Sequence, residues 1–136
     1  MNYKKILGVF IFSSLVIAGC KSQYEELLTS GDSDAKYAAA FDYFNKGKYG
    51  KSAQLFESLS MLTQGTERDD TVNFYWALSN YNQKDYYTAE SNLEHFIENY
   101  PASPFAESAE FLRIDCLYRS RSEERRVGKE CRSRWS

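Results

Sequence analysis

The residue with the clearest chemistry in this 136-residue chain is Cys20, which ends the run Ile17-Ala-Gly-Cys20. Small residues before a cysteine, at the end of an apolar run, are typical of a bacterial lipobox, in which the thiol receives a diacylglycerol. A positive start, Lys4-Lys5, precedes the apolar run, and that run is too short to span a membrane. We predict that residues 1–19 are a lipoprotein signal peptide and that Cys20 is the lipidation site. An ordinary secretory signal that happens to end at a cysteine is the alternative.

The residue after the lipid site bears on the destination of the protein. In well-studied Gram-negative sorting, an Asp at this position resembles an inner-membrane retention signal, whereas this chain has Lys21. Each buried methylene contributes about 0.8 kcal/mol, so a multiply acylated (palmitate-bearing) Cys20 would anchor the protein stably without a spanning helix. We expect a lipid anchor in the outer membrane, on its periplasmic side.

The other reactive groups form no recognisable catalytic or metal-binding pattern. His95 is the only histidine, it lies between Glu94 and Glu98, and no Cys or second His stands at metal-ligand spacing. The chain has no glycine-rich phosphate loop and no nucleophile elbow. Cys116 has apolar neighbours, which is typical of a buried thiol that packs as a small hydrophobic residue. We therefore predict no enzyme activity, no cofactor and no metal site.

Charge excludes a nucleic-acid partner, since residues 20–120 contain nine Lys and Arg against sixteen Asp and Glu. Binding to phosphates needs a basic footprint, which this region does not have.

The residues that could bind a protein partner depend on helices, and the strongest helical pattern runs from Asp85 to Pro101. Pro101 cannot continue a helix, so it marks the end. The apolar residues fall at spacings of three and four on one face, as in the second helix of a tetratricopeptide repeat: Tyr86, Ala89, Leu93, Phe96, Ile97 and Tyr100.

This pattern recurs at a spacing of 37 residues, because residues 74–81 match residues 37–44 before them and residues 111–118 after them. The second helices agree at the same offset, with the pairs Tyr49/Tyr86, Ser52/Ala89, Phe56/Leu93 and Leu59/Phe96. Small residues let the two helices of a repeat approach closely, and these are Ala40, Ala77, Ser52 and Ala89. The usual period is about 34, and we place the insertion at residues 63–68.

The predicted fold class is all-α: a tetratricopeptide-repeat solenoid of two helical hairpins plus the first helix of a third, over residues 33–120. Residues 20–32 are expected to be a lipid anchor and a tether with some helical character. A polar residue, Asp32 or Ser33, is available to cap the first helix of the first repeat.

Aromatic residues recur on the first helix of each repeat, and first helices line the concave groove of such arrays. An aromatic ladder there would suit an extended or helical peptide. The predicted groove residues are Tyr37, Phe41, Phe44, Phe74, Tyr81, Phe111 and Tyr118. The alternative is that these side chains pack between repeats.

Residues 121–136 break the repeat pattern and carry six of the seventeen basic residues of the chain. The segment resembles the translation of a common sequencing adapter. We expect that it is read-through and not a domain, that the chain is truncated at this end, and that structure there is disordered or arbitrary, with no evolved function for Cys131. A natural basic tail is the alternative.

Several of these stretches together resemble the BamD family of outer-membrane assembly lipoproteins: the lipobox at Cys20, Tyr24–Leu28, Asp34–Phe44, Gly65–Arg68 and Tyr100–Glu107. The resemblance implies a periplasmic array of five repeats, of which this chain is the N-terminal half, in the complex that folds β-barrel proteins into the outer membrane. Implied partners are unfolded outer-membrane proteins at the N-terminal repeats, a BamA-type barrel subunit at the C-terminal repeats, and other assembly subunits. Ile114, where a small residue is expected, departs from the repeat consensus.

Two rival functions stay open at this point. The chain could be another periplasmic repeat lipoprotein that serves a secretion or cell-wall complex, or the N-terminal part of an envelope enzyme.

Overall fold

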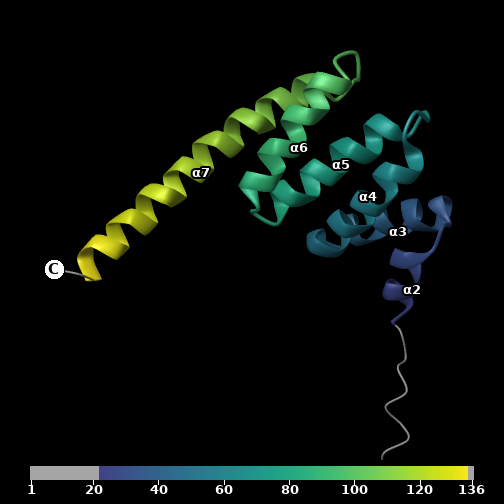
Figure 1. The fold of residues 1–136 in the computed structure, drawn as a ribbon, viewed down its shortest axis with the longest axis horizontal. Coiled ribbons are helices and arrows are strands. Elements are labelled where there is room, and N and C mark those ends of the chain that lie inside the picture. Colours follow the sequence, from purple (N-terminus) through teal and green to yellow (C-terminus); the bar gives the residue numbers. More distant parts are fainter. Residues whose placement is uncertain (1–21, 135–136) are drawn as a thin grey trace, which may run out of the picture.

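The computed structural model describes residues 22–134, with side chains up to residue 127, and this part of the chain forms six helices and no strand (Figure 1). The helices are α2 (Gln23–Thr29), α3 (Ser33–Asn45), α4 (Tyr49–Thr63), α5 (Asp69–Asn82), α6 (Tyr86–Asn99) and α7 (Ala106–Arg134). From α3 onward each helix packs on the next one along the chain, which is the arrangement of a solenoid. The predicted all-α repeat fold is confirmed. The predicted signal peptide and Cys20 lie outside the described residues.

Helix α6 has the start, the stop and the buried face that its sequence predicts. The side chain of Asp85 accepts a hydrogen bond from the backbone N–H of Thr88 at 3.2 Å and so caps the helix. The helix ends at Asn99, two residues before Pro101. Its buried residues are Tyr86, Ala89, Leu93 and Phe96, while Ile97 and Tyr100 are half-buried.

The first two hairpins turn at equivalent positions, because Gly47 and Lys84 are 37 residues apart and both have left-handed backbone, at φ of 70° and 69°. Glycine adopts this conformation at no steric cost, whereas Lys84 adopts it at some cost. The next equivalent position is Arg121, where α7 continues as a helix instead of turning. The 37-residue recurrence of turns therefore stops at the same place as the recurrence in the sequence.

Small residues bring the paired helices together, as predicted. Ala40, Ala77, Ser52 and Ala89 are all fully buried. The hydroxyl of Ser52 donates a hydrogen bond to the carbonyl of Ala40 at 3.0 Å, which satisfies its buried oxygen. The close approach of α3 and α4 thus depends on a side chain no larger than serine.

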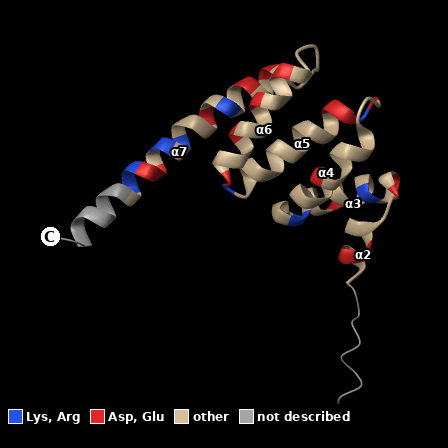
Figure 2. Ribbon diagram, viewed as in Figure 1, with Lys and Arg blue, Asp and Glu red and all other residues tan. Residues whose placement is uncertain are grey.

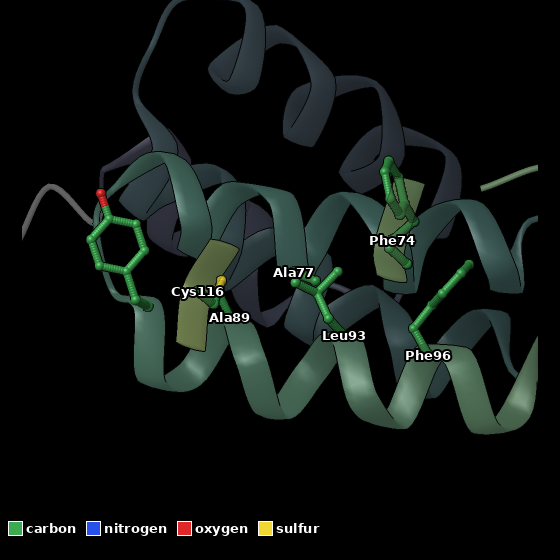
Figure 3. Packing of buried hydrophobic residues seen from close by; sticks show 8 residues of the cluster. Phe74, Ala77, Ala89, Leu93, Phe96 and Cys116 are labelled. Atoms are coloured by element: carbon green, nitrogen blue, oxygen red, sulfur yellow. The ribbon is translucent and has the colours of Figure 1, made fainter. Parts of the chain in front are cut away.

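The apolar core consists of two clusters, one for each hairpin. The first is built around Leu55, Phe56 and Leu59 of α4. The second joins α5, α6 and α7 and includes Leu93, Phe96 and Cys116 (Figure 3). Because α7 contributes Ala109 and Cys116 to the second cluster, it covers the outer face of the second hairpin.

Two parts of the chain differ from what the sequence predicted. The tether is a packed helix, α2, whose capping box joins Ser22 and Glu25 and whose Leu27 and Leu28 lie against the first core cluster. Residues 121–134 continue α7 as helix, where the sequence predicted disordered or arbitrary structure. Side chains 121–127 are exposed. No described helix is both long and apolar enough to cross a membrane.

Candidate functional site

The seven predicted groove residues fall into two groups, because five of them are buried or half-buried and two are exposed. Phe111 and Tyr118, both on α7, expose 72% and 70% of their surface. The other five contact aromatic rings of their own or neighbouring helices, which favours the alternative of packing between repeats: Tyr37, Phe41, Phe44, Phe74 and Tyr81.

Phe44 and Tyr81 occupy the same place in successive hairpins. The ring of Phe44 meets that of Tyr49 edge-on, with centroids 5.4 Å apart, and the ring of Tyr81 meets that of Tyr86 in the same way at 5.6 Å. Both pairs join the end of a first helix to the start of the second helix. Such pairs contribute roughly 0.5–1.5 kcal/mol beyond area burial. These contacts close the hairpins, and both rings are half-buried.

Phe74 is wrongly assigned to the groove, because it is only 6% exposed. Its ring stacks on Phe105 at 4.6 Å and contacts Phe96 at 5.7 Å. Phe105 precedes α7, and its equivalent 37 residues earlier is Arg68, whose guanidinium lies 4.9 Å from the ring of Tyr37. The residue just before α5 therefore covers the aromatic residue Tyr37 of α3, and the residue just before α7 covers Phe74 of α5 in the same way.

Phe41 is half-buried within the first hairpin. Its ring lies 5.1 Å from Phe56 of α4 and 4.7 Å from Tyr75 of α5. Tyr75, which the sequence analysis did not single out, contacts aromatic residues on α3, α4 and the α6–α7 junction. The hydrophobic periodicity of α5 was the signal that could have identified it.

Three of the exposed large apolar residues lie on one face of α7, and we call Phe111, Ile114 and Tyr118 the α7 stripe. Met61 and Leu62 on α4 and Tyr87 on α6 are exposed elsewhere. Ile114 is 59% exposed. The three residues have the spacing of one helix face, and their equivalents in α5 are Phe74, Ala77 and Tyr81, the face that α6 covers. Within the described residues no helix covers the stripe.

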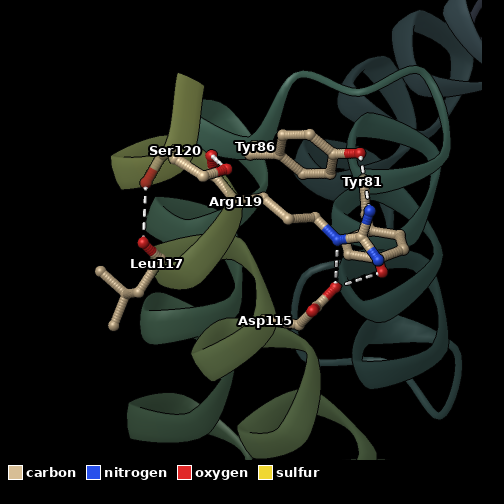
Figure 4. Close-up of polar contacts among 7 residues, drawn as sticks. Tyr81, Tyr86, Asp115, Leu117, Arg119 and Ser120 are labelled. Atoms are coloured by element: carbon tan, nitrogen blue, oxygen red, sulfur yellow. Dashed lines mark hydrogen bonds and ion pairs between the residues drawn. The ribbon is translucent and has the colours of Figure 1, made fainter. Parts of the chain in front are cut away.

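Polar contacts fix the orientation of α7 next to the stripe (Figure 4). The hydroxyl of Tyr81 donates to a carboxylate oxygen of Asp115 at 2.5 Å, and Nε of Arg119 donates to the same oxygen at 2.5 Å. The guanidinium of Arg119 also lies 5.5 Å from the ring centroid of Tyr86. These contacts join α5, α6 and α7, and they hold the stripe in place on the side of α7 away from the core.

The charges in this cluster perturb one another. Two hydrogen bonds lower the pKa of Asp115, and the one from Tyr81 has a larger effect than the one from Arg119. The bond between Tyr81 and Asp115 also raises the pKa of Tyr81, and pairing with Asp115 raises the pKa of Arg119. All three groups keep their ordinary charge at neutral pH, so the cluster is a structural one and not a proton-transfer site.

The described residues offer little reactive chemistry. No group of three His, Cys, Asp or Glu among them could hold a metal ion. His95 is exposed on α6, and Cys116 is fully buried, where burial raises the pKa of its thiol to about 11. A thiol with such a pKa is almost entirely protonated at neutral pH and is a poor nucleophile.

Comparison with known proteins identifies the family of this chain. The family described as YfiO, outer membrane lipoprotein, matches residues 30–134. A putative outer membrane protein assembly factor BamD from Aquifex aeolicus is 30% identical over 115 residues, which cover 83% of this chain. The chain spans 37% of the length of that relative. The match over most of the chain, together with the repeat fold described above, shows that the chain belongs to the YfiO family of outer membrane lipoproteins.

Proposed function

We propose that this protein is a non-enzymatic, lipid-anchored subunit of the machinery that assembles β-barrel proteins in the outer membrane, and that it works by binding protein segments. Membership of an outer-membrane lipoprotein family and similarity to an assembly factor support the first part. The lipobox that ends at Cys20 supports anchorage on the periplasmic side. The partners in this proposal are unfolded outer-membrane proteins, a BamA-type barrel subunit and other assembly subunits.

The proposal rests on the family match over residues 30–134, and the α7 stripe is its candidate binding surface. Phe111, Ile114 and Tyr118 expose 72%, 59% and 70% of their surface on one helix face. The equivalent face of α5 packs under α6, so its geometry suits an apolar helix or an extended apolar segment. Burying these side chains contributes about 25 cal/mol for each Å² of apolar surface removed from water. Barrel precursors alternate apolar and polar residues along each strand, so they offer matching side chains.

Crosslinking in cells tests this site directly. A photo-crosslinking amino acid is placed at Phe111 or at Tyr118 of the full chain, and the matched control positions are Glu94 and Glu98, which are exposed on α6. We expect covalent adducts with outer-membrane protein precursors or assembly subunits from α7 only. Equal capture from both helices would contradict the proposed site. Products in which no second protein is attached would show that the chain covers its own stripe, and they would also contradict it.

The two rival functions make different predictions in the same experiment. Adducts with proteins of a secretion or cell-wall complex would favour a different periplasmic scaffold. The described residues do not themselves favour a catalytic role, because the one buried thiol is protonated and the one histidine is exposed.

A further inference from the structure

The turn between α3 and α4 is basic in a chain region that is otherwise acidic. It reads Lys46-Gly-Lys-Tyr-Gly-Lys51, three lysines in six residues. The equivalent turn of the second hairpin, residues 83–88, reads Gln-Lys-Asp-Tyr-Tyr-Thr, with one lysine and one aspartate. Both turns have a left-handed residue at the equivalent position, Gly47 or Lys84, and in both the next helix begins with a tyrosine. The additional lysines are therefore not needed to form the turn.

Helix α2 packs its first residues beside this basic turn. The hydroxyl of Tyr24 donates to Oε1 of Gln54 at 2.7 Å and lies 3.2 Å from the carbonyl oxygen of Lys51. The Tyr24 and Tyr43 rings meet edge-on, with centroids 5.4 Å apart. Nζ of Lys51 lies 4.7 Å from the first ring centroid and 5.4 Å from the second. The chain therefore joins the folded domain at its most basic turn.

Acidic groups near the turn leave two of its three lysines available. Asp42 pairs with Lys46 at 2.6 Å. Glu25 accepts a hydrogen bond from the backbone N–H of Ser22 in the α2 capping box, and Glu26 is exposed one residue further along α2. No carboxylate among the described residues forms an ion pair with Lys48 or Lys51, which are both exposed. Figure 2 shows Lys and Arg segments in blue at the end of the first hairpin.

The number of residues between the lipid site and α2 limits where this surface can lie. Gln23, the first residue of α2, is three positions after Cys20. A fully extended chain spans at most about 3.3–3.6 Å per residue, so α2 begins within about 10 Å of the lipid attachment point. A lipid on Cys20 would hold Tyr24 and the basic turn at the depth of the headgroups.

We propose that the basic turn, together with Tyr24 and Tyr43, is a membrane-contact surface that lies on the periplasmic face of the bilayer and binds anionic phospholipid headgroups. This proposal rests on the proposed lipid anchor. Lysine stems and tyrosine rings suit the interface because each combines an apolar body with a polar tip. Lys48 and Lys51 would face headgroup phosphates, which fixes the first hairpin next to the bilayer. A second attachment next to the lipid would also limit rotation of the solenoid about its anchor.

Amine footprinting of the lipidated full chain in vesicles tests this surface. The protein is inserted into vesicles of phosphatidylcholine alone or of phosphatidylcholine mixed with phosphatidylglycerol, and exposed amines are acetylated and located by mass spectrometry. Lys84, in the equivalent turn of the second hairpin, is the matched control. We expect acetylation of Lys48 and Lys51 to fall severalfold in the phosphatidylglycerol vesicles relative to detergent, while Lys84 changes little. Equal acetylation of all three lysines in both vesicle types and in detergent would overturn the proposal.

Flotation with the vesicles separates failure of the anchor from failure of the surface. The unchanged chain should float with vesicles and Cys20→Ala should not. A chain that floats but shows no lysine protection would disprove the membrane-contact surface alone. A chain that carries no lipid and does not float would disprove the anchor, and the surface proposal would fall with it.

Discussion

Phe74 and Phe111 occupy the same repeat position, yet alanine substitution should lower the free energy of unfolding at the first site and leave it nearly unchanged at the second. Phe74 is 6% exposed and contacts Phe96 and Phe105, whereas Phe111 is 72% exposed. Replacing a buried phenylalanine by alanine costs about 3–5 kcal/mol, from lost transfer free energy and the cavity left behind. Exposed substitutions usually change stability by less than about 0.5 kcal/mol. We therefore expect Phe74→Ala to be destabilised by about 3 kcal/mol or more and Phe111→Ala to unfold like the unchanged protein.

Urea unfolding followed by helical circular dichroism measures this difference. For a domain of this size about 1 kcal/mol corresponds to roughly 4–8 °C in Tm, so Phe74→Ala should also melt more than about 10 °C lower. The exposed variant is the control for expression and handling. No loss of stability in Phe74→Ala would show that Phe74 is not a core residue and would restore it to the groove. A similar loss in Phe111→Ala would show that the ring of Phe111 is covered.

Four further outcomes are expected. Lys36 is 3% exposed, its ammonium donates to Ser58, and burial lowers its pKa. Lys36→Met should therefore raise the free energy of unfolding by about 1 kcal/mol at pH 7. This gain should shrink at alkaline pH, where the lysine becomes neutral, and urea unfolding curves at both pH values measure it. The pKa of Asp115 is lowered in the folded protein, so its carboxylate stabilises the fold above the ordinary pKa of about 4, and this stabilisation is lost as pH falls through the folded-state pKa. The free energies of unfolding of Asp115→Asn and the unchanged protein should therefore differ by at most about 1 kcal/mol at pH 7 and become equal in acid. Iodoacetamide should label Cys116 only in denaturant, because burial raises its pKa to about 11, and rapid labelling in native buffer, read by peptide mass spectrometry, would argue against its burial. Sequencing of the locus from intact genomic DNA should find a different sequence in place of the codons for residues 121–136. Recovery of the same sixteen codons would show that the segment is natural.

Helix positions were predictable because their signals are local. Periodic apolar residues, the Asp85 cap and Pro101 define α6 without reference to the rest of the chain. The 37-residue offset then gave the hairpins, since both turns have the same backbone conformation at Gly47 and Lys84. Asp32 also caps α3 as predicted.

The site could not be read in the same way, because exposure depends on what covers a residue from elsewhere in the chain. Phe74 and Phe111 are equivalent in sequence, and the contacts with Phe96 and Phe105 make the first one a core residue. The cross-helix bond from Tyr81 to Asp115 likewise joins residues 34 positions apart that have no local relation. The packing of α2 was missed for the same reason, since Tyr24 finds its partner Gln54 thirty residues away.

The most direct test of the proposed role is depletion of the intact gene product in cells, followed by measurement of folded β-barrel proteins in the outer membrane. Folded and unfolded barrels are separated on semi-native gels, and periplasmic soluble proteins serve as the control. We predict that folded barrels decline and unfolded precursors accumulate, and that a copy with Cys20→Ala restores them poorly while the unchanged gene restores them fully. Normal levels of folded barrel proteins after complete depletion would contradict a role in outer-membrane protein assembly.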